Sequence, residues 1–160
     1  MFDNRVLTSP HHDPKEITMR IRAIDAMHDI HTATNDVLKG YREMLARAEP
    51  DIQSVIRRLT AMHERHAAEQ EAELARMRDA TKDDSSMQGT VNKVVVIMRD
   101  WLSNLDRDVL PAVRQGEESL LAEYRKAIEE VQPRDSMSVL ALLKTQSDSI
   151  ASEIAQLPKA

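Results

Sequence analysis

Residues 110–131 form a segment whose apolar side chains recur at alternating spacings of three and four. This is the a/d rhythm of a helix that packs in a bundle, so the segment predicts a long amphipathic helix. The residues on its apolar stripe are Leu110, Val113, Glu117, Leu120, Tyr124, Ala127 and Val131. Glu117 is the one acid among them. A carboxylate that faces a bundle interior is either a candidate metal ligand or a costly buried charge.

The composition indicates a single, nearly all-helical domain. The chain has 160 residues, of which 31% are charged and 41% hydrophobic, and only three are glycine. This balance is typical of helical proteins, and the length is sufficient to bury a core. Aromatic residues make up 2% of the chain, so aliphatic side chains and the nine methionines must build that core.

Several partner classes are disfavoured by what the chain contains. The formal charge is -5 and no block of Lys and Arg stands out, so we expect no nucleic-acid partner. The chain has no cysteine, which removes disulfides, thiolate catalysis and thiolate metal sites. No apolar run approaches the roughly 20 residues of a membrane span. Together with the polar N-terminus, this predicts a soluble, cytoplasmic protein without a membrane partner.

Prolines and capping residues divide the chain into segments. Residues 1–12 are expected to form a flexible N-terminal arm, followed by one bundle domain over residues 13–158. Asp13 and Pro14 are a helix start, Pro50 and Pro133 are breaks, and Asp108 is a candidate cap. The predicted long helices cover residues 14–48, 50–79, 109–131 and 136–157, and a short helix is predicted around the run VVVIMRDWL between the second and third.

The lengths of these segments indicate a topology. The first two helices are joined by a short turn and must be antiparallel neighbours. Residues 80–108 are numerous enough to return along the bundle, which would make the second and third long helices parallel. That is the ferritin-like arrangement with one crossover connection, although a simple up-down bundle stays open. The predicted fold class is therefore an all-α, ferritin-like four-helix bundle with a short extra helix in the crossover.

Polar residues interrupt the apolar seams of the first hairpin. One seam of the first helix is Ile17, Ile21, Ile24, His28, His31, Asn35, Leu38 and Leu45. A neighbouring seam is Met27, Ile30, Thr34, Val37, Tyr41 and Met44. The second helix has Ile52, Ile56, Leu59, His63, His66, Gln70, Glu73 and Met77. Counting back equally from the turn puts His66 near His31, His63 near Asn35, and Gln70 near His28. This predicts four histidines in one layer.

The second half of the chain has the features of a known family. They are a Gly-led segment with an Arg-x-Trp step, and a Gly-Glu-acid step followed by Tyr and Ala; the residues are Gly89, Arg99, Trp101, Gly116, Glu117, Glu118, Tyr124 and Ala127. With these, residues 25–157 resemble a bacterial ferritin-like four-helix-bundle family of unknown function, in the ferritin and rubrerythrin-like group. The resemblance implies the bundle fold and a stress association, but no established reaction.

The chain lacks the ligand pattern of a standard di-iron carboxylate site. Such a site takes a Glu from each of two helices and a Glu-x-x-His from each of the other two. No Glu-x-x-His occurs, and His66 is the last histidine, so the third and fourth helices supply no imidazole. The remaining candidate ligands for a divalent metal are His28, His31, His63, His66, Glu69, Glu73 and Glu117. Imidazole suits zinc, copper, nickel or iron.

The same residues also fit a structural role. Facing histidines, Asn35 and Gln70 can form a hydrogen-bonded layer that fixes the helix register, and Glu117 can pair with an Arg or with Tyr41. We therefore expect a bundle with a degenerate di-iron site that is not an enzyme. The alternatives are a non-standard metal-binding oxidoreductase that uses the histidine and carboxylate layer, and a helical protein–protein interaction module. A homodimer is expected, because a second copy would cover apolar stripes on the long helices.

Overall fold

The computed structural model describes residues 13–81 and 105–159, and it is all-α over these ranges. The described elements are α1 (Pro14–Leu45), α2 (Pro50–Thr81), the 3-10 helix η1 (Arg107–Val109), α4 (Leu110–Glu130) and α5 (Met137–Gln156). These bounds lie within three residues of the four long helices predicted from the sequence. The predicted arm over residues 1–12, and the predicted short helix with Trp101, lie outside the described residues.

The helix starts follow from local hydrogen bonding. Asp13 caps α1, because its Oδ1 accepts a hydrogen bond of 3.0 Å from the backbone N–H of Lys15. Ser136 caps α5 in the same way. The prediction that Asp108 caps the third long helix is wrong. Asp106 accepts from the N–H of Asp108 instead, and it starts a turn of 3-10 helix that leads into α4.

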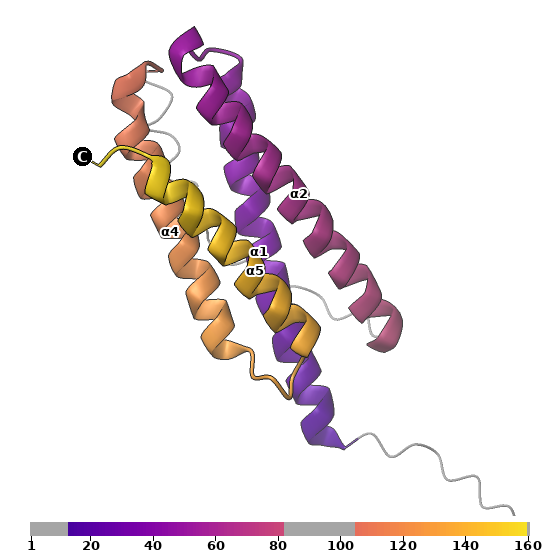
Figure 1. The fold of residues 1–160 in the computed structure, drawn as a ribbon. Coiled ribbons are helices and arrows are strands. Elements are labelled where there is room, and N and C mark those ends of the chain that lie inside the picture. Colours follow the sequence, from indigo (N-terminus) through magenta and orange to yellow (C-terminus); the bar gives the residue numbers. More distant parts are fainter. Residues whose placement is uncertain (1–12, 82–104, 160) are drawn as a thin grey trace, which may run out of the picture.

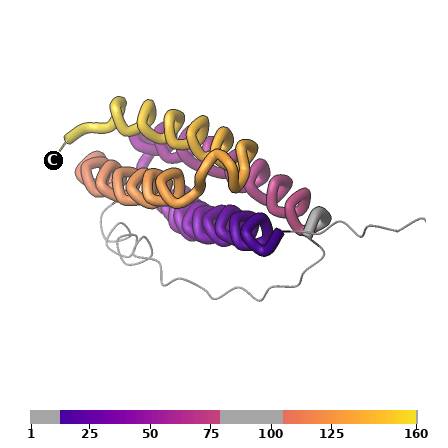
Figure 2. Tube along the Cα trace, turned by 90° about the horizontal axis from the view of Figure 1, so that it is seen from below, coloured from indigo at the N-terminus to yellow at the C-terminus, as the bar shows by residue number. Residues whose placement is uncertain are grey.

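Four helices pack side by side as a bundle. α1 packs against α2 and α4, and α5 packs against α4 and α2. In Figure 2, α5 and α2 lie on one side of the bundle and α4 and α1 lie on the other. Each helix thus has two neighbours, so α2 and α4 are diagonal to each other. Side chains from these two helices meet only across the centre of the bundle.

The diagonal helices α2 and α4 run parallel (Figure 1). The N–H of Glu49 donates to the carbonyl of Leu105 at 3.2 Å, so the two helices start at the same end of the bundle. Further along, His63 meets Glu117 and Gln70 meets Tyr124, an advance of seven residues on both helices. The end of α2 and the start of α4 therefore lie at opposite ends of the bundle. This confirms the parallel pair that the length of residues 80–108 predicted.

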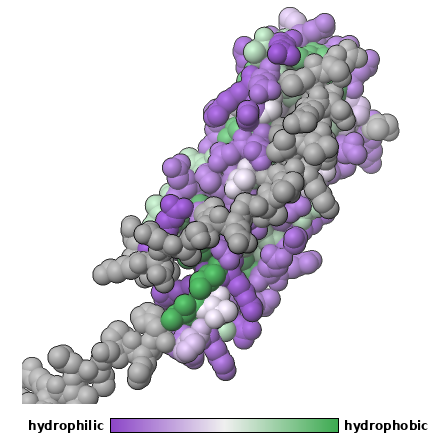
Figure 3. Space-filling view, turned by 180° about the vertical axis from the view of Figure 1, so that it is seen from behind, coloured by the Kyte–Doolittle hydropathy of each residue, from purple (hydrophilic) through white to green (hydrophobic). Residues whose placement is uncertain are grey.

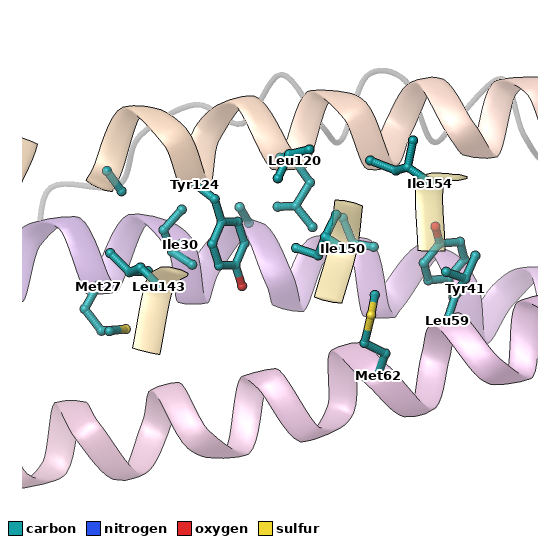
Figure 4. Close-up of a cluster of buried hydrophobic side chains, with 14 of the residues drawn as sticks. Met27, Ile30, Tyr41, Leu59, Met62, Leu120, Tyr124, Leu143, Ile150 and Ile154 are labelled. Atoms are coloured by element: carbon teal, nitrogen blue, oxygen red, sulfur yellow. The ribbon is translucent and has the colours of Figure 1, made fainter. Parts of the chain in front are cut away.

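The apolar stripes meet in one core. Figure 4 shows part of it, with Met27, Ile30 and Leu143 toward one end and Tyr41, Leu59 and Ile154 toward the other. All seven residues of the predicted apolar stripe in residues 110–131 are buried, and Glu117 is among them. The seam of α1 that faces inward is the one from Met27 to Met44. Burial of these side chains is the main force that holds the helices together.

The prediction of two buried seams on the first helix is only half right. Ile17 and Ile21 are each 44% exposed, and Asn35 is also exposed. The first turns of α1 extend beyond the end of α2 (Figure 1), so α2 does not cover these side chains. Figure 3 shows hydrophobic residues at this end of an otherwise mostly hydrophilic face. Over the described residues, no helix has the length and hydropathy that a membrane span requires.

Candidate functional site

Two clusters of polar side chains lie inside the bundle. The carboxylate cluster consists of Tyr41, His63, His66 and Glu117. The amide cluster consists of Thr34, Glu69, Gln70, Tyr124 and Gln146. Except for Glu69, every member of both clusters is almost fully buried. All four long helices contribute to them, so they join the helices at mid-height of the bundle.

Glu117 is the centre of the carboxylate cluster. Its side chain is fully buried, and its Oε1 accepts a short hydrogen bond from the hydroxyl of Tyr41. Nε2 of His63 lies 2.9 Å from Oε1 and 3.1 Å from Oε2. The predicted contact between Glu117 and Tyr41 is therefore present, and the acid also has an imidazole partner. Because an ionised carboxylate only accepts hydrogen bonds, the hydrogen of His63 belongs on Nε2.

Burial fixes the protonation of Tyr41. Loss of solvent raises the pKa of its hydroxyl well above the ordinary value, and the charge of Glu117 raises it further. The hydroxyl therefore stays protonated and keeps donating to the carboxylate. The ring of Tyr41 also stacks on that of His63, with centroids 5.9 Å apart and planes 19° from parallel. The hydrogen bond to Glu117 and the stacking on Tyr41 together hold the imidazole of His63 in one orientation.

His66 is one turn further along α2 from His63. The two rings meet edge to face, with centroids 5.8 Å apart. Burial lowers the pKa of His66 to about 4, and the charges of His63 and Arg65 act in the same direction. The His66 ring is therefore neutral near pH 7. Nδ1 of His63 and Nδ1 of His66 are both buried, and neither has a hydrogen-bond partner among the described residues.

Gln70 is the centre of the amide cluster. Its Nε2 lies 2.7 Å from the hydroxyl of Tyr124 and 2.8 Å from Oε1 of Gln146. Gln146 donates in turn to Oε2 of Glu69 at 2.9 Å, and Gln70 also reaches the hydroxyl of Thr34. Burial raises the pKa of Tyr124, so its hydroxyl remains a donor. These bonds satisfy polar groups that would otherwise cost free energy in the core.

The predicted layer of four histidines is wrong. Only His63 and His66 are in the carboxylate cluster. Nδ1 of His31 lies 3.3 Å from Oε1 of Gln70, and its Nε2 lies 3.1 Å from the amide of Asn35. Nε2 of His28 lies 3.3 Å from Arg78. Burial, followed by the charges of Arg78 and His31, lowers the pKa of His28.

Side-chain direction explains the error. In an α-helix each side chain points back toward the N-terminus of its own helix. In an antiparallel pair, the side chains of α1 therefore lean away from the turn and those of α2 lean toward it. A residue on α1 meets one further along α2 than an equal count predicts. His31 accordingly meets Gln70 where the count predicted His66, and His28 meets Arg78 where it predicted Gln70.

The acidic residues predicted as metal ligands also lie apart from one another. Glu69 bonds to Gln146 in the amide cluster. Glu73 pairs with Arg76 and accepts from the hydroxyl of Ser138 at 2.6 Å. The Arg76 hydrogen bond holds the pKa of Glu73 below its ordinary value, although burial opposes this. In the described part of the chain, no group of three or more His, Asp and Glu side chains is placed to hold a metal ion.

These residues do not fit a di-iron centre. Such a centre takes carboxylates from all four helices and two imidazoles. The carboxylate cluster supplies one acid, and both oxygens of that acid already contact His63. α1 meets Glu117 with Tyr41, and the buried polar side chains of α5 are Gln146 and Ser147. The described donor set therefore differs from the di-iron set in both number and kind.

Sequence reasoning missed the link between Gln146, Tyr124 and Gln70. The predicted apolar stripes include Gln70 and Tyr124, but nothing in the sequence links them to each other or to Gln146. The available signal was that each is a polar residue on an apolar stripe, and that the stripes belong to three different helices. Buried polar groups need partners, so polar residues at inward positions of packed helices are expected to find one another.

A polar groove of about 640 Å³ lies between α2 and α5. It is lined by Arg58, Ala61, Met62, Arg65, Thr145, Asp148, Ser149, Ser152 and Glu153. Arg58 and Glu153 pair across it at 2.8 Å. Met62 and Arg65 are adjacent in sequence to His63 and His66, respectively. The groove therefore lies beside the carboxylate cluster and carries charges of both signs.

Comparison with known proteins connects this bundle to one family. Searches of curated proteins and of solved structures found no significant match. A family model described as Domain of unknown function (DUF2383) matches residues 22–130. The match covers most of α1, all of α2 and all of α4, including Tyr41, His63, His66 and Glu117. Because it spans more than half of the chain, the protein belongs to the DUF2383 family.

Proposed function

We propose that this protein is a ferritin-like helical bundle with a degenerate di-iron site, and that it is not an enzyme. The proposal is carried by Glu117, a fully buried acid whose partners are a tyrosine hydroxyl and one imidazole. In a di-iron bundle, further carboxylates would occupy this level. Here the other buried side chains of the two clusters are amides, hydroxyls and imidazoles.

The helix topology supports the ferritin-like part of the proposal. A parallel pair of diagonal helices, with one long connection between them, is the arrangement of ferritin-like bundles. α2 and α4 have this relation, since both start beside the contact between Glu49 and Leu105. The resemblance to ferritin-like families suggests a stress association. The cytoplasmic location is likewise a prediction from composition.

Iron loading tests the proposal directly. Untagged protein would be incubated with Fe(II) in air, and bound iron and the rate of Fe(II) oxidation would be measured. We expect no pair of irons per chain and an oxidation rate equal to that of buffer. The matched variant Glu117→Gln should behave identically. Two bound irons per chain, or catalytic oxidation that Glu117→Gln abolishes, would show that the site is a working di-iron centre.

A self-association role is the second proposal. Ile17 and Ile21 are 44% exposed and Met137 is 75% exposed. They belong to the first turns of α1 and α5, which start at the same end of the bundle (Figure 1). A second copy that covers this end would form the predicted homodimer. Light scattering after size exclusion should then give twice the 18.2 kDa chain mass. The variant Ile17→Glu/Ile21→Glu should be monomeric, and a wild-type monomer would contradict the proposal.

A further inference from the structure

We propose that the start of α1 and the turn between α4 and α5 form a binding site for a small phosphomonoester. The charged residues of this site are Lys15, Arg22 and Arg134, which line a common cavity. The site goes beyond the proposed function, because it lies at one end of the bundle and uses no residue of the carboxylate cluster or the amide cluster.

The first argument is the convergence of three cations from two elements. Lys15 and Arg22 are seven residues apart on α1, so two turns of helix place them on the same face. Arg134 belongs to the turn that joins α4 to α5, and this turn lies at the same end of the bundle as the start of α1 (Figure 1). All three side chains line one cavity of about 300 Å³. The packing of the bundle thus gathers positive charge in one hollow.

The second argument is that this charge has no partner in the cavity. The other lining residues are Pro14, Thr18 and Met19, so the lining contains no acid. The groove between α2 and α5 differs, since it has two cations and two acids, and Arg58 pairs there with Glu153. Within the described part of the chain, none of the three cations of the cavity forms an ion pair. A bound anion would offset their mutual repulsion.

The acids next to the cavity in sequence have other contacts. Asp13 accepts from the backbone N–H of Lys15 at 3.0 Å. Asp135 is buried and accepts from the backbone N–H of Gln132 at 2.8 Å. These two carboxylates and the exposed Glu16 weaken the local positive field, but none of the three lines the cavity. The cationic side chains therefore remain the groups that a ligand meets there.

The third argument is the chemistry of the ligand. The guanidinium fork of arginine forms paired hydrogen bonds with phosphate oxygens, and lysine adds a point charge. A phosphomonoester near pH 7 has about 1.5 to 2 negative charges and three acceptor oxygens, so one group can contact three cations. The cavity volume of about 300 Å³ is at the lower end of the range for small-molecule sites. Met19 and Pro14 provide apolar surface beside the charges, which fits a small organic group on the phosphate.

Titration with phenyl phosphate tests the site, with inorganic phosphate and phenol as controls. Backbone amide shifts of ¹⁵N-labelled wild-type protein would be followed at low ionic strength. We expect saturable shifts at Lys15, Arg22 and Arg134, weaker binding of inorganic phosphate, and no binding of phenol. Added NaCl should weaken the binding of phenyl phosphate, because salt screens exposed charges.

Single charge removals distinguish a site from general attraction. Arg22→Gln and Arg134→Gln should each weaken the binding of phenyl phosphate about 10-fold, through loss of one charge-assisted hydrogen bond. The matched control is Arg20→Gln, which removes the same charge from the same two turns of α1. Arg20 is exposed and does not line the cavity, so we expect a change of about 2-fold or less. The wild-type titration decides the question by itself if a variant fails to fold.

Three results would each overturn the proposal. They are the absence of saturable shifts in the wild type, equal weakening by Arg20→Gln and Arg134→Gln, and equal affinity for phenol and phenyl phosphate. Binding to vesicles that contain phosphatidic acid, without binding of phenyl phosphate, would assign these cations to a membrane surface and would also overturn it. None of these outcomes bears on iron oxidation, so the proposed function and this site fail or stand separately.

Discussion

At the scale of single residues, the buried charge of Glu117 determines what its neighbours must be. A carboxylate in a core is tolerated only when strong hydrogen bonds replace its hydration. Tyr41 and His63 provide these bonds from the two other helices that meet Glu117. The sequence alone indicated an Arg or Tyr41 as the partner, and Tyr41 was a candidate because both residues are on inward stripes. It could not predict His63, because that contact depends on how the helices are offset along the bundle axis.

Tyr41→Phe should lower the free energy of unfolding by about 1.5–3 kcal/mol, the range for a hydrogen bond to a charged group. The comparison is Tyr124→Phe, which removes a hydroxyl of equal burial that bonds to the neutral amides of Gln70 and Gln146. We expect a smaller loss there, about 0.5–1.5 kcal/mol. Urea unfolding of the three proteins measures both values. Equal losses would mean that Glu117 is not charged in the folded protein.

His66 should make the protein less stable in acid. Its folded pKa of about 4 lies below the ordinary value of 6.5. Between these two values the unfolded chain binds a proton that the folded protein does not. His66 therefore has no effect on the pH dependence above about pH 6.5, and stability is lost as pH falls from there toward 4.

The slope from this one residue is at most about 1.4 kcal/mol per pH unit. The measurement is urea unfolding at intervals from pH 7.5 to 4.5, for wild type and for His66→Gln. We expect the variant to show a smaller slope over this range. Part of the slope should remain, because the pKa of His28 is also lowered. Identical slopes in the two proteins would show that His66 is solvated in the folded state.

At the scale of helices, local signals account for almost everything that the sequence predicted correctly. Asp13, Pro14 and Pro50 set helix starts because capping and the fixed backbone of proline act over only a few residues. The inward stripe of α4 was predicted residue by residue because it depends only on the helical period. The buried seam of α1 could not be predicted in this way. Two neighbouring seams have similar patterns, and the choice between them depends on the positions of α2 and α4.

The caps Asp13 and Ser136 should differ in their effect on stability. Ser136→Ala should cost about 1 kcal/mol, because α5 is packed from its first turns and cannot lose its cap without weakening the bundle. Asp13→Ala should cost clearly less in global unfolding. Ile17 and Ile21 are exposed, so the first turns of α1 can fray on their own.

Hydrogen exchange separates these two effects. In Asp13→Ala we expect faster exchange limited to the amides of the first two turns of α1. In Ser136→Ala the slowest amides of all four helices should exchange faster by the same factor, since they exchange through global unfolding. A global effect of Asp13→Ala would indicate that the exposed start of α1 is packed against something in solution.

At the scale of the whole molecule, the parallel relation of α2 and α4 separates this bundle from a simple up-down one. In an up-down bundle the third long helix would start beside the end of the second. Here Leu105 is beside Glu49, and Arg107 pairs with Asp51 at 3.6 Å, so α4 starts beside the start of α2. Sequence length indicated this topology without establishing it, because a long connection permits a return along the bundle but does not require one.

A disulfide cross-link distinguishes the two topologies in solution. The chain has no cysteine, so Glu49→Cys/Leu105→Cys introduces a single pair whose backbones are joined by a hydrogen bond of 3.2 Å. Because this bond brings the two backbones close together, mild oxidation should close the disulfide. The control Arg78→Cys/Leu105→Cys puts the cysteines at opposite ends of the bundle and should not close within one chain. An up-down bundle reverses both results, because it brings residue 105 close to the end of α2 and removes it from residue 49. Non-reducing electrophoresis and mass spectrometry of the monomer measure how much of each disulfide forms. A disulfide in the control, with none in Glu49→Cys/Leu105→Cys, would overturn the topology on which the carboxylate cluster depends.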